Sequence, residues 1–208
     1  MAEAPKGRKG RRHSNLHGYV VIDKPAGWTS HDVVAKVRRI LGERRVGHAG
    51  TLDPAAVGVL PIAVGLATRT VEYLANSTKS YRADVTFGIE TDSGDADGTV
   101  THVADVTHLT RSGVEPLLQA FHGRQMQAPP MHSAIKVGGK RLYELARQGG
   151  EIDVPSREVT IHSLALVDWR SPTMTIDVTC SKGTYIRSLA RDLGKRMGTG
   201  AYLSHLVR

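Results

Sequence analysis

The hydrophobic pattern that most constrains the fold is a change from alternating to helical spacing near residue 183. Upstream of Gly183, apolar residues occupy every second position: Met174, Ile176, Val178 and Cys180. This alternation is typical of a strand with one buried face. Downstream, apolar residues recur at helical spacing until Gly198: Ile186, Leu189, Ala190, Leu193 and Met197. The chain therefore predicts a strand that leads through a glycine into an amphipathic helix.

Weaker patterns predict further strands and helices along the chain. Strands are expected at 19–23 and 83–87, and the acidic turn at 92–98 should fold the second strand back onto 99–103 as a hairpin. Between residues 57 and 73 a strand should precede a helix that begins near Thr68. Further helices are expected from Val114 to Gly123 and from Leu142 to Gly149. Because strands and helices mix without a strict βαβ order, we predict an α+β fold, a largely antiparallel central sheet flanked by helices.

The helix expected at 30–41 has the most complete signals. Ser30 should cap its N-terminus, and Gly42 should end it. Five apolar residues define the face that should be buried: Val33, Val34, Val37, Ile40 and Leu41.

Length and composition indicate an ordinary globular chain. The 208 residues fit one domain, and 40% hydrophobic with 23% charged residues is neither a disordered nor a membrane composition. The longest apolar stretch, residues 57–67, is interrupted by Pro61 and is too short to span a bilayer. A single cysteine, Cys180, excludes an internal disulfide and a zinc site built from cysteines, and fits a reducing compartment such as the cytoplasm.

The net charge of +8 is concentrated in three segments. Residues 1–14 hold 5 basic and 1 acidic residues, residues 122–149 hold 5 and 1, and residues 180–208 hold 6 and 1. The remaining 12 basic and 17 acidic residues make the rest of the chain net negative. Local basic segments on an acidic body predict a polyanionic partner, with nucleic acid favoured over a membrane because no basic amphipathic helix of the membrane type occurs. Residues 1–17 are interpreted as a disordered basic tail.

Several common catalytic motifs are missing from the sequence. It contains no Walker loop, no G-x-S-x-G and no H-E-x-x-H motif, so ATP hydrolysis, serine hydrolysis and zincin chemistry lack support. The acidic run from Asp92 to Gly98 has neither the spacing nor the closing glutamate of a calcium loop. A hairpin turn explains most of these acidic residues better than a calcium site.

One glycine-rich loop does combine residues that could perform chemistry. The segment G-H-A-G-T-L-D-P (47–54) places His48 and Asp53 where the backbone can approach a ligand closely, and Pro54 favours an extended conformation for Asp53. Elsewhere, Tyr81 enters a predicted strand, and the junction at 183–187 offers Tyr185 and an arginine, Arg187, that can pair with a carboxylate.

Together these segments resemble the TruB family of bacterial tRNA pseudouridine synthases. The similarity rests on V-I-D-K-P-A-G-W-T-S (21–30), G-H-A-G-T-L-D-P (47–54), K-S-Y (79–81), P-P-M-H-S-A-I-K-V-G-G-K-R-L-Y-E-L-A-R (129–147) and C-S-K-G-T-Y-I-R-S-L-A-R-D-L-G (180–194). These motifs occur in the family's order and spacing, and the resemblance covers nearly all of 19–206. It implies the pseudouridine synthase fold, with residues 18–208 as the catalytic domain.

The resemblance also implies an activity. A family member isomerises uridine 55 in the T loop of tRNA to pseudouridine, by base flipping and an aspartate-dependent rearrangement of the glycosidic bond. It uses no cofactor or metal, works in the cytoplasm and acts as a monomer on the T stem-loop, without membrane or obligate protein partner. Two alternatives stay open: a guide-RNA-dependent synthase acting on ribosomal RNA, which shares the G-H-x-G-T-L-D-P loop, and an RNA-binding or RNA-folding module with incidental catalysis.

Matching the motifs residue by residue assigns three catalytic positions. Asp53 matches the catalytic aspartate, acting by addition to the sugar, addition to the base or removal of the 2′ proton. Arg187 matches the arginine that pairs with this aspartate and keeps it ionised. Tyr81 matches the tyrosine that stacks on the target ring.

Five further positions are implied to contact the substrate. His48 would enter the RNA loop, Tyr185 would line the pocket, and Asp95 would join the active-site network. Lys79 and Lys136 would lie near phosphates or the base.

The sequence departs from the family in two respects. His132 stands where many relatives carry an aromatic residue. The family also usually continues into a small C-terminal β domain that helps bind the acceptor arm, whereas this sequence stops at Arg208. We therefore expect that domain to be absent and the affinity for tRNA to be weaker.

Overall fold

The computed structural model describes residues 15–133, 136–137, 140–142 and 154–208, with backbone alone at 136–137 and 140–141. Residues 1–14 of the expected tail lie outside this range, as does the expected helix after Leu142. Short strands β8 (Lys136–Val137) and β9 (Lys140–Arg141) pair with each other.

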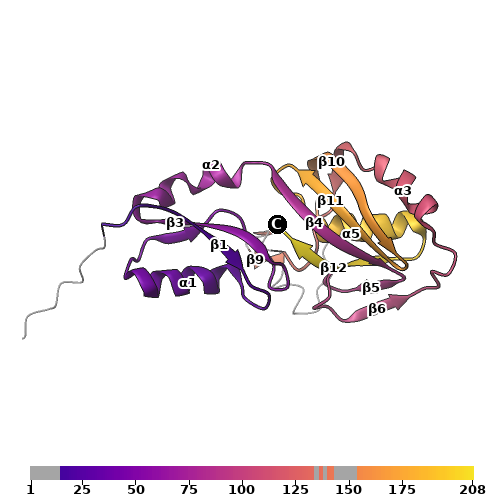
Figure 1. Ribbon diagram of the computed structural model, residues 1–208, viewed down its shortest axis with the longest axis horizontal. Helices are drawn as coiled ribbons and strands as arrows, with labels where there is room; N and C mark the ends of the chain where they lie inside the picture. Colours follow the sequence, from indigo (N-terminus) through magenta and orange to yellow (C-terminus); the bar gives the residue numbers. More distant parts are fainter. Residues whose placement is uncertain (1–14, 134–135, 138–139, 143–153) are drawn as a thin grey trace, which may run out of the picture.

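A small antiparallel sheet forms one side of the molecule (Figure 1). Its strands lie in the order β1 (Gly18–Lys24), β3 (Gly58–Val64) and β2 (Val46–His48). Helix α1 (Ser30–Leu41) lies on one side of this sheet, and η1 (Gly65–Thr70) with α2 (Val71–Ala75) lies on the other (Figure 1). The strand predicted at 19–23 and the strand followed by helix predicted in 57–73 are therefore confirmed.

Helix α1 forms as predicted, with two corrections at the residue level. Its N-cap is Thr29, which forms a capping box with Asp32, and not Ser30. The Ser30 side chain is instead buried inside the molecule. Ile40 is 68% exposed, whereas Leu41, the other apolar residue of the last turn, packs against the core. Gly42 ends the helix in the left-handed conformation, as expected.

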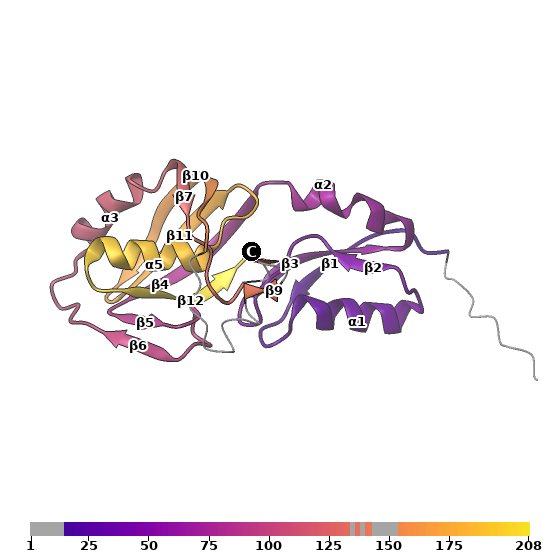
Figure 2. The ribbon, with the colours of Figure 1, turned by 180° about the vertical axis from the view of Figure 1, so that it is seen from behind.

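A larger antiparallel sheet forms the other side of the molecule. Its strand order is β12 (Ala201–Val207), β4 (Lys79–Phe87), β11 (Thr173–Cys180), β10 (Arg157–Arg170) and β7 (Gly123–Gln127). Helices α5 (Ile186–Met197) and α3 (Arg111–Gln119) cover the same face of this sheet (Figure 2). The predicted change from strand to helix near Gly183 corresponds to β11 and α5. All the pairings within these two sheets are antiparallel, which confirms the α+β class.

The predicted hairpin is displaced from its expected position. The acidic turn joins β5 (Ile89–Thr91) to β6 (Val100–Val103), so residues 83–87 are not a hairpin strand. They belong to β4, between β11 and β12 in the larger sheet. Gly88, with φ +85°, separates β4 from β5, and its backbone N–H donates to the Gly200 carbonyl. The sequence thus predicts the turn correctly, but the strand that precedes the turn is β5 and not residues 83–87.

Strand β12 connects the two sides of the molecule (Figure 1). Within the large sheet it pairs with β4, and isolated bridges join Val207 to Val57 and Leu203 to Asp95. The Val57 N–H donates to the Leu206 carbonyl at 2.9 Å, and the Leu203 N–H donates to the Gly94 carbonyl at 3.0 Å. The loop that follows β2 and the acidic turn are therefore held on the same strand.

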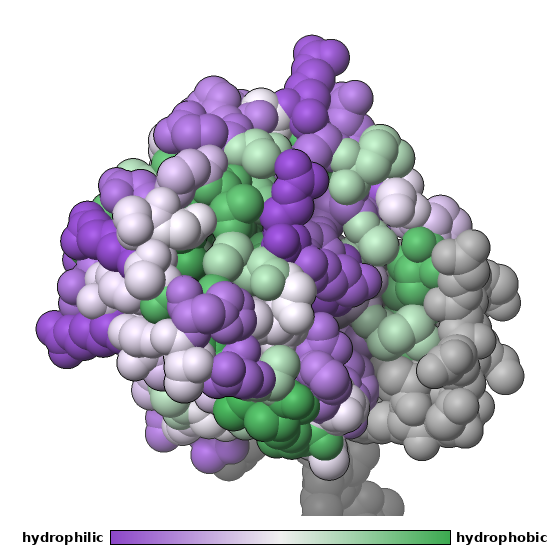
Figure 3. All heavy atoms as spheres, turned by 90° about the vertical axis from the view of Figure 1, so that its right-hand side faces the viewer, coloured by the Kyte–Doolittle hydropathy of each residue, from purple (hydrophilic) through white to green (hydrophobic). Residues whose placement is uncertain are grey.

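The surface is mainly polar, with scattered apolar side chains. The end of the molecule that carries α3 and the β5–β6 hairpin shows separate small hydrophobic patches on a hydrophilic background (Figure 3). Val100 and Val103 of β6 are both exposed. Isolated exposed apolar residues of this kind are common in globular proteins. Among the described residues, no helix is long and apolar enough to cross a membrane.

Candidate active site

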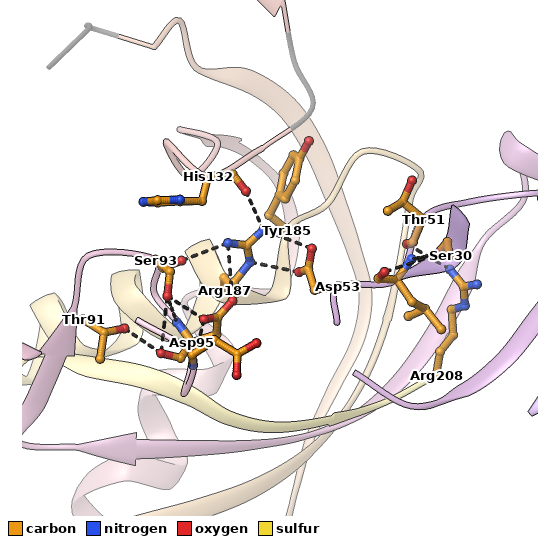
Figure 4. A network of polar contacts seen from close by, with 12 residues as sticks. Ser30, Thr51, Asp53, Thr91, Ser93, Asp95, His132, Tyr185, Arg187 and Arg208 are labelled. Carbon is orange, nitrogen blue, oxygen red and sulfur yellow. Dashed lines mark hydrogen bonds and ion pairs between the residues drawn. The ribbon is translucent and has the colours of Figure 1, made fainter. Parts of the chain in front are cut away.

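Asp53 lies in the loop between β2 and β3, and side chains from three other elements bind the loop backbone around it. Arg208 donates to the carbonyl oxygens of Gly50 and Thr51. The Ser30 hydroxyl donates to the Leu52 carbonyl at 3.1 Å and accepts from the Leu52 N–H at 2.9 Å. These contacts fix the loop immediately before the carboxylate, as Figure 4 shows for Ser30, Thr51 and Arg208.

Lys24 secures the loop on the other side of Asp53. Its side chain is fully buried, and its ammonium donates to the carbonyl oxygens of Pro25, Trp28 and Pro54 at 2.9, 2.7 and 3.0 Å. Burial lowers the pKa of Lys24, and the negative charge of Asp53 partly opposes this effect. The end of β1 is thus joined to the residue that follows Asp53.

Asp53 and Arg187 form an ion pair across the two sides of the molecule. Arg187, in the first turn of α5, donates from Nη2 to Asp53 Oδ1 at 3.2 Å, and its Nε lies 3.0 Å from Oδ2 without the direction of a hydrogen bond. The Arg187 side chain is only 5% exposed, whereas that of Asp53 is 37% exposed. The arginine is therefore embedded in protein, while the carboxylate keeps one open side that a substrate can reach.

Other groups hold the guanidinium of Arg187 in place (Figure 4). Its Nη1 donates to the Ser93 carbonyl at 2.9 Å and lies 3.5 Å from Asp95 Oδ2. Its Nη2 also donates to the His132 carbonyl at 2.9 Å. Asp95 is itself buried, and its carboxylate accepts hydrogen bonds from the Ser93 hydroxyl and the Asp97 N–H. The structure thus brings Asp95 into the network around Asp53 and Arg187, and it involves His132 through its backbone.

Arg187 favours the ionised form of Asp53, as expected from the sequence, but burial acts in the opposite direction. Burial raises the pKa of Asp53, and the neighbouring Asp95 carboxylate adds to this increase. Arg187 and, more weakly, Lys24 act in the opposite direction, but the net shift is upward. Arg187 therefore offsets only part of the desolvation of this carboxylate.

Two tyrosines flank this region from different elements. Tyr81, on β4, is half-buried, and burial is the main factor that raises its pKa, which Arg208 partly opposes. Tyr185 lies directly before α5, two residues ahead of Arg187, and Figure 4 shows its side chain in the region of this network. The buried Gln127 side chain fixes the Tyr185 backbone, accepting from its N–H at 2.8 Å and donating to its carbonyl at 3.2 Å.

His48 lies at the end of β2, at the start of the same loop. Its ring contacts that of His31 edge to face, with centroids 5.5 Å apart. Burial is the main factor that lowers the pKa of His48, followed by the neighbouring His31 and Arg208. A neutral imidazole is therefore favoured at this position.

The two predicted lysines give different outcomes. The ammonium of Lys79 donates to the carbonyl oxygens of Leu74, Ala75 and Ser77, so in this structure it binds the C-terminal end of α2. The side chain of Lys136 lies outside what the structure describes. No cluster of three or more histidine, cysteine, aspartate or glutamate side chains that could hold a metal occurs within the described ranges.

Sequence reasoning missed the residues that position the Asp53 loop and the Tyr185 backbone: Lys24, Ser30, Gln127 and Arg208. Each binds at least one backbone atom that is distant in the sequence. Lys24 and Ser30 do fall in the V-I-D-K-P-A-G-W-T-S motif, which is the one signal that could have drawn attention to them.

Comparison with known proteins identifies the family. A family model described as TruB family pseudouridylate synthase, N terminal domain, matches residues 38–186. This chain belongs to the TruB family. It is 56% identical over 198 residues to a protein of Symbiobacterium thermophilum named tRNA pseudouridine synthase B, covering 94% of this chain and 66% of that protein. It is 55% identical over 196 residues to a protein of the same name from Synechocystis, covering 93% and 66%. The chain thus spans slightly less than two thirds of these two TruB relatives.

Solved structures show the same fold in more distant proteins. The chain is similar to one in a Cbf5-Nop10-Gar1 complex, with a TM-score of 0.72, 30% identity, and coverage of 94% of this chain and 49% of that one. It is also similar to a chain in an H/ACA RNP bound to a substrate RNA containing 2′-deoxyuridine, with a TM-score of 0.68, 28% identity, and coverage of 92% and 46%. The pseudouridine synthase fold expected from the sequence is therefore confirmed. The TruB relatives are clearly more similar in sequence than these complexes.

Proposed function

We propose that residues 18–208 are the catalytic domain of a tRNA pseudouridine synthase that isomerises uridine 55 of the T loop. The observation that carries the proposal is the environment of the Asp53 carboxylate. Its carboxylate lies in a loop anchored on both sides, is paired with the buried Arg187, and keeps one open side. The TruB relatives named for tRNA support tRNA as the substrate.

The reaction needs a well-placed carboxylate more than it needs a cofactor. The bond between ribose C1′ and uracil N1 breaks, the base turns, and a bond forms between C1′ and C5. C5 loses its proton and N1 gains one, so the composition of the RNA does not change. A carboxylate can support this exchange by adding to the sugar, adding to the base or removing the 2′ proton. In each case Asp53 acts in its ionised form, and the fixed guanidinium of Arg187 compensates its charge in a partly desolvated site.

The uridine must leave the stacked RNA loop to reach Asp53. Unstacking a nucleotide requires a few kcal/mol, which stacking on aromatic side chains commonly offsets. We assign this stacking to Tyr81, with Tyr185 lining the pocket. We assign His48, at the start of the same loop, to the contact that helps to displace the nucleotide. Lys136 is assigned to phosphate binding, and Lys79 could join it only by leaving its carbonyl partners.

The enzyme should act on tRNA without a guide RNA and without an obligate protein partner. The support is sequence similarity, since identity to the tRNA enzymes is 56% and 55% but only 30% and 28% to the chains from the complexes. We expect it to act as a monomer in the cytoplasm, where unmodified tRNA is available.

The test is incubation of the protein alone with an unmodified tRNA transcript, followed by carbodiimide mapping of pseudouridine. We expect one modified position, in the T loop. A transcript with cytidine at that position should give no product. Asp53→Asn should bind the transcript with little change in Kd but form no pseudouridine. Normal turnover by Asp53→Asn, or modification only after guide RNA is added, would contradict the proposal.

A further inference from the structure

Arg208, at the end of β12, binds the backbone of the Asp53 loop with its side chain. Its Nε donates to the Val59 carbonyl at 2.8 Å, Nη2 donates to the Gly50 carbonyl at 3.2 Å, and Nη1 reaches the Thr51 carbonyl at 3.4 Å. A guanidinium has a rigid fork of donors that can hold several acceptors in a fixed relation. Arg208 therefore joins the loop before Asp53 to strand β3, which follows the loop.

The backbone of Arg208 is fixed independently of its side chain. Its N–H donates to the Val57 carbonyl at 3.0 Å, and its carbonyl accepts from the Val59 N–H at 3.1 Å. The guanidinium thus projects from an anchored position back over the loop. This arrangement makes it a structural brace and not a loosely attached surface charge.

The loop sequence leaves room for this guanidinium. Gly50 has φ +111°, and a Cβ atom at this residue would lie 3.3 Å from Arg208 Nη1. A side chain at this position would be strained and would crowd the arginine. The space that the Arg208 guanidinium needs is therefore one reason why the second glycine of the G-H-A-G-T-L-D-P loop is a glycine.

Arg208 is also close to two groups that we assign to substrate contact. Burial is the main influence on the pKa values of Tyr81 and His48, and Arg208 is among the charges that lower both. One side chain thus acts electrostatically on Tyr81 and His48 and also binds the backbone before Asp53. The residue lies outside the segment 38–186 that matches the family model.

We propose that Arg208 is a positioning residue that fixes the Asp53 loop relative to Tyr81 and His48 during the reaction. This inference rests on the proposed function. Arg208 acts through the backbone of Gly50 and Thr51 and not by contact with the reacting atoms. Because a displacement of about 1 Å can reduce a reaction rate about 100-fold, loss of this brace should affect the chemical step more than RNA binding.

The test compares Arg208→Met, Arg208→Lys and the wild type in single-turnover assays on a tRNA transcript. Methionine removes all three hydrogen bonds to carbonyl oxygens. Lysine keeps the positive charge but lacks the forked arrangement of donors of a guanidinium. At saturating enzyme we expect the rate of Arg208→Met to fall about 100-fold and that of Arg208→Lys about 10-fold. We expect Kd and its dependence on salt to stay unchanged. Arg170→Met is the matched control, because Arg170 is 87% exposed on β10 and outside the site, and its rate should equal that of the wild type.

Two kinetic results would overturn the inference. If Kd rises while the saturated rate is unchanged, and the salt slope falls by about one, Arg208 is a phosphate contact. If neither quantity changes, the brace has no role in the reaction.

Hydrogen exchange tests the brace without relying on activity. The Leu52 N–H, which is bound to Ser30, should exchange faster in Arg208→Met, while amides of β10 and β11 should not change. Unchanged exchange at Leu52 would refute the brace itself. If the wild type makes no pseudouridine but exchange at Leu52 responds, the proposed function fails and the structural part of the inference stands.

Discussion

The buried Lys24 gives the most direct test of how the Asp53 loop is held. Lys24→Met keeps a side chain of similar length but removes the ammonium and its three hydrogen bonds to carbonyl oxygens. The Lys24 side chain is 0% exposed, so water cannot replace the ammonium without a rearrangement of the loop. The substitution should therefore leave the Pro25 and Trp28 carbonyls without this donor, whereas the Pro54 carbonyl still accepts from the Gly27 N–H at 2.9 Å.

The expected destabilisation follows from the two acceptors that lose their donor. A buried polar group without its partner costs about 1–3 kcal/mol, which gives a gross loss of roughly 2–6 kcal/mol. The variant also avoids burying a charge, the effect that lowers the pKa of Lys24, so the net loss should be near the lower end, about 2–3 kcal/mol. For a chain of this size that corresponds to a decrease in Tm of roughly 4–12 °C.

Urea unfolding followed by circular dichroism measures this change. Lys36→Met is the matched control, since Lys36 is exposed on α1 and its replacement should change the free energy of unfolding by less than about 0.5 kcal/mol. If Lys24→Met unfolds at the same urea concentration as the control, the Pro25 and Trp28 carbonyls do not depend on Lys24, and the reasoning is wrong. A stable Lys24→Met variant with full activity would also show that the loop does not need this anchor.

Three further predictions follow from the site and the packing. Ionised Asp53 is the acting form, and its pKa is raised above the usual 3.8, so the single-turnover rate should fall on acidification through a pH above that value. Asp95→Asn removes a carboxylate that raises this pKa and should therefore move the decline in rate to lower pH. Gly194→Ala should lower Tm despite the higher helix propensity of alanine, because the added Cβ would lie 2.2 Å from the Ala201 backbone nitrogen. The control Gly113→Ala, on α3, should raise Tm slightly. Equal shifts in the two variants would contradict this packing argument. Tyr81→Phe should retain most tRNA modification and Tyr81→Ala should lose it, as measured by pseudouridine mapping, and equal rates would exclude stacking.

The elements that could be predicted are those with a regular hydrophobic period. Helices α1 and α5 and strand β11 each keep one period throughout, so their type follows from the sequence. Strands β10 and β12 contain shifts in register, between Ile161 and Ser163, between Leu166 and Asp168, and between Leu203 and His205. A bulge moves the alternation to the other face, which conceals a strand from a search for strict alternation. For this reason the strand that connects the two sides of the molecule was not foreseen.

The site shows a similar division between motif residues and supporting residues. The family motifs predict three site residues by their positions within the motifs: Asp53, Arg187 and Tyr81. The anchors were not, because they bind backbone atoms far away in the sequence: Ser30 binds Leu52, and Arg208 binds Gly50. A bond to a carbonyl oxygen does not depend on the type of side chain at that residue, so it leaves little trace in the sequence.

The sequence alone therefore determined the family, the α+β class, and the carboxylate and arginine expected to meet. Local spacing and motif order are sufficient for these conclusions because both are properties of the chain itself. Only the tertiary structure showed that Arg187 is buried while Asp53 keeps an open side, and that burial outweighs the arginine in setting the pKa of Asp53. Desolvation depends on every atom packed around a group, and those atoms come from β1, β12, α1, α5 and the acidic turn, which only folding brings together.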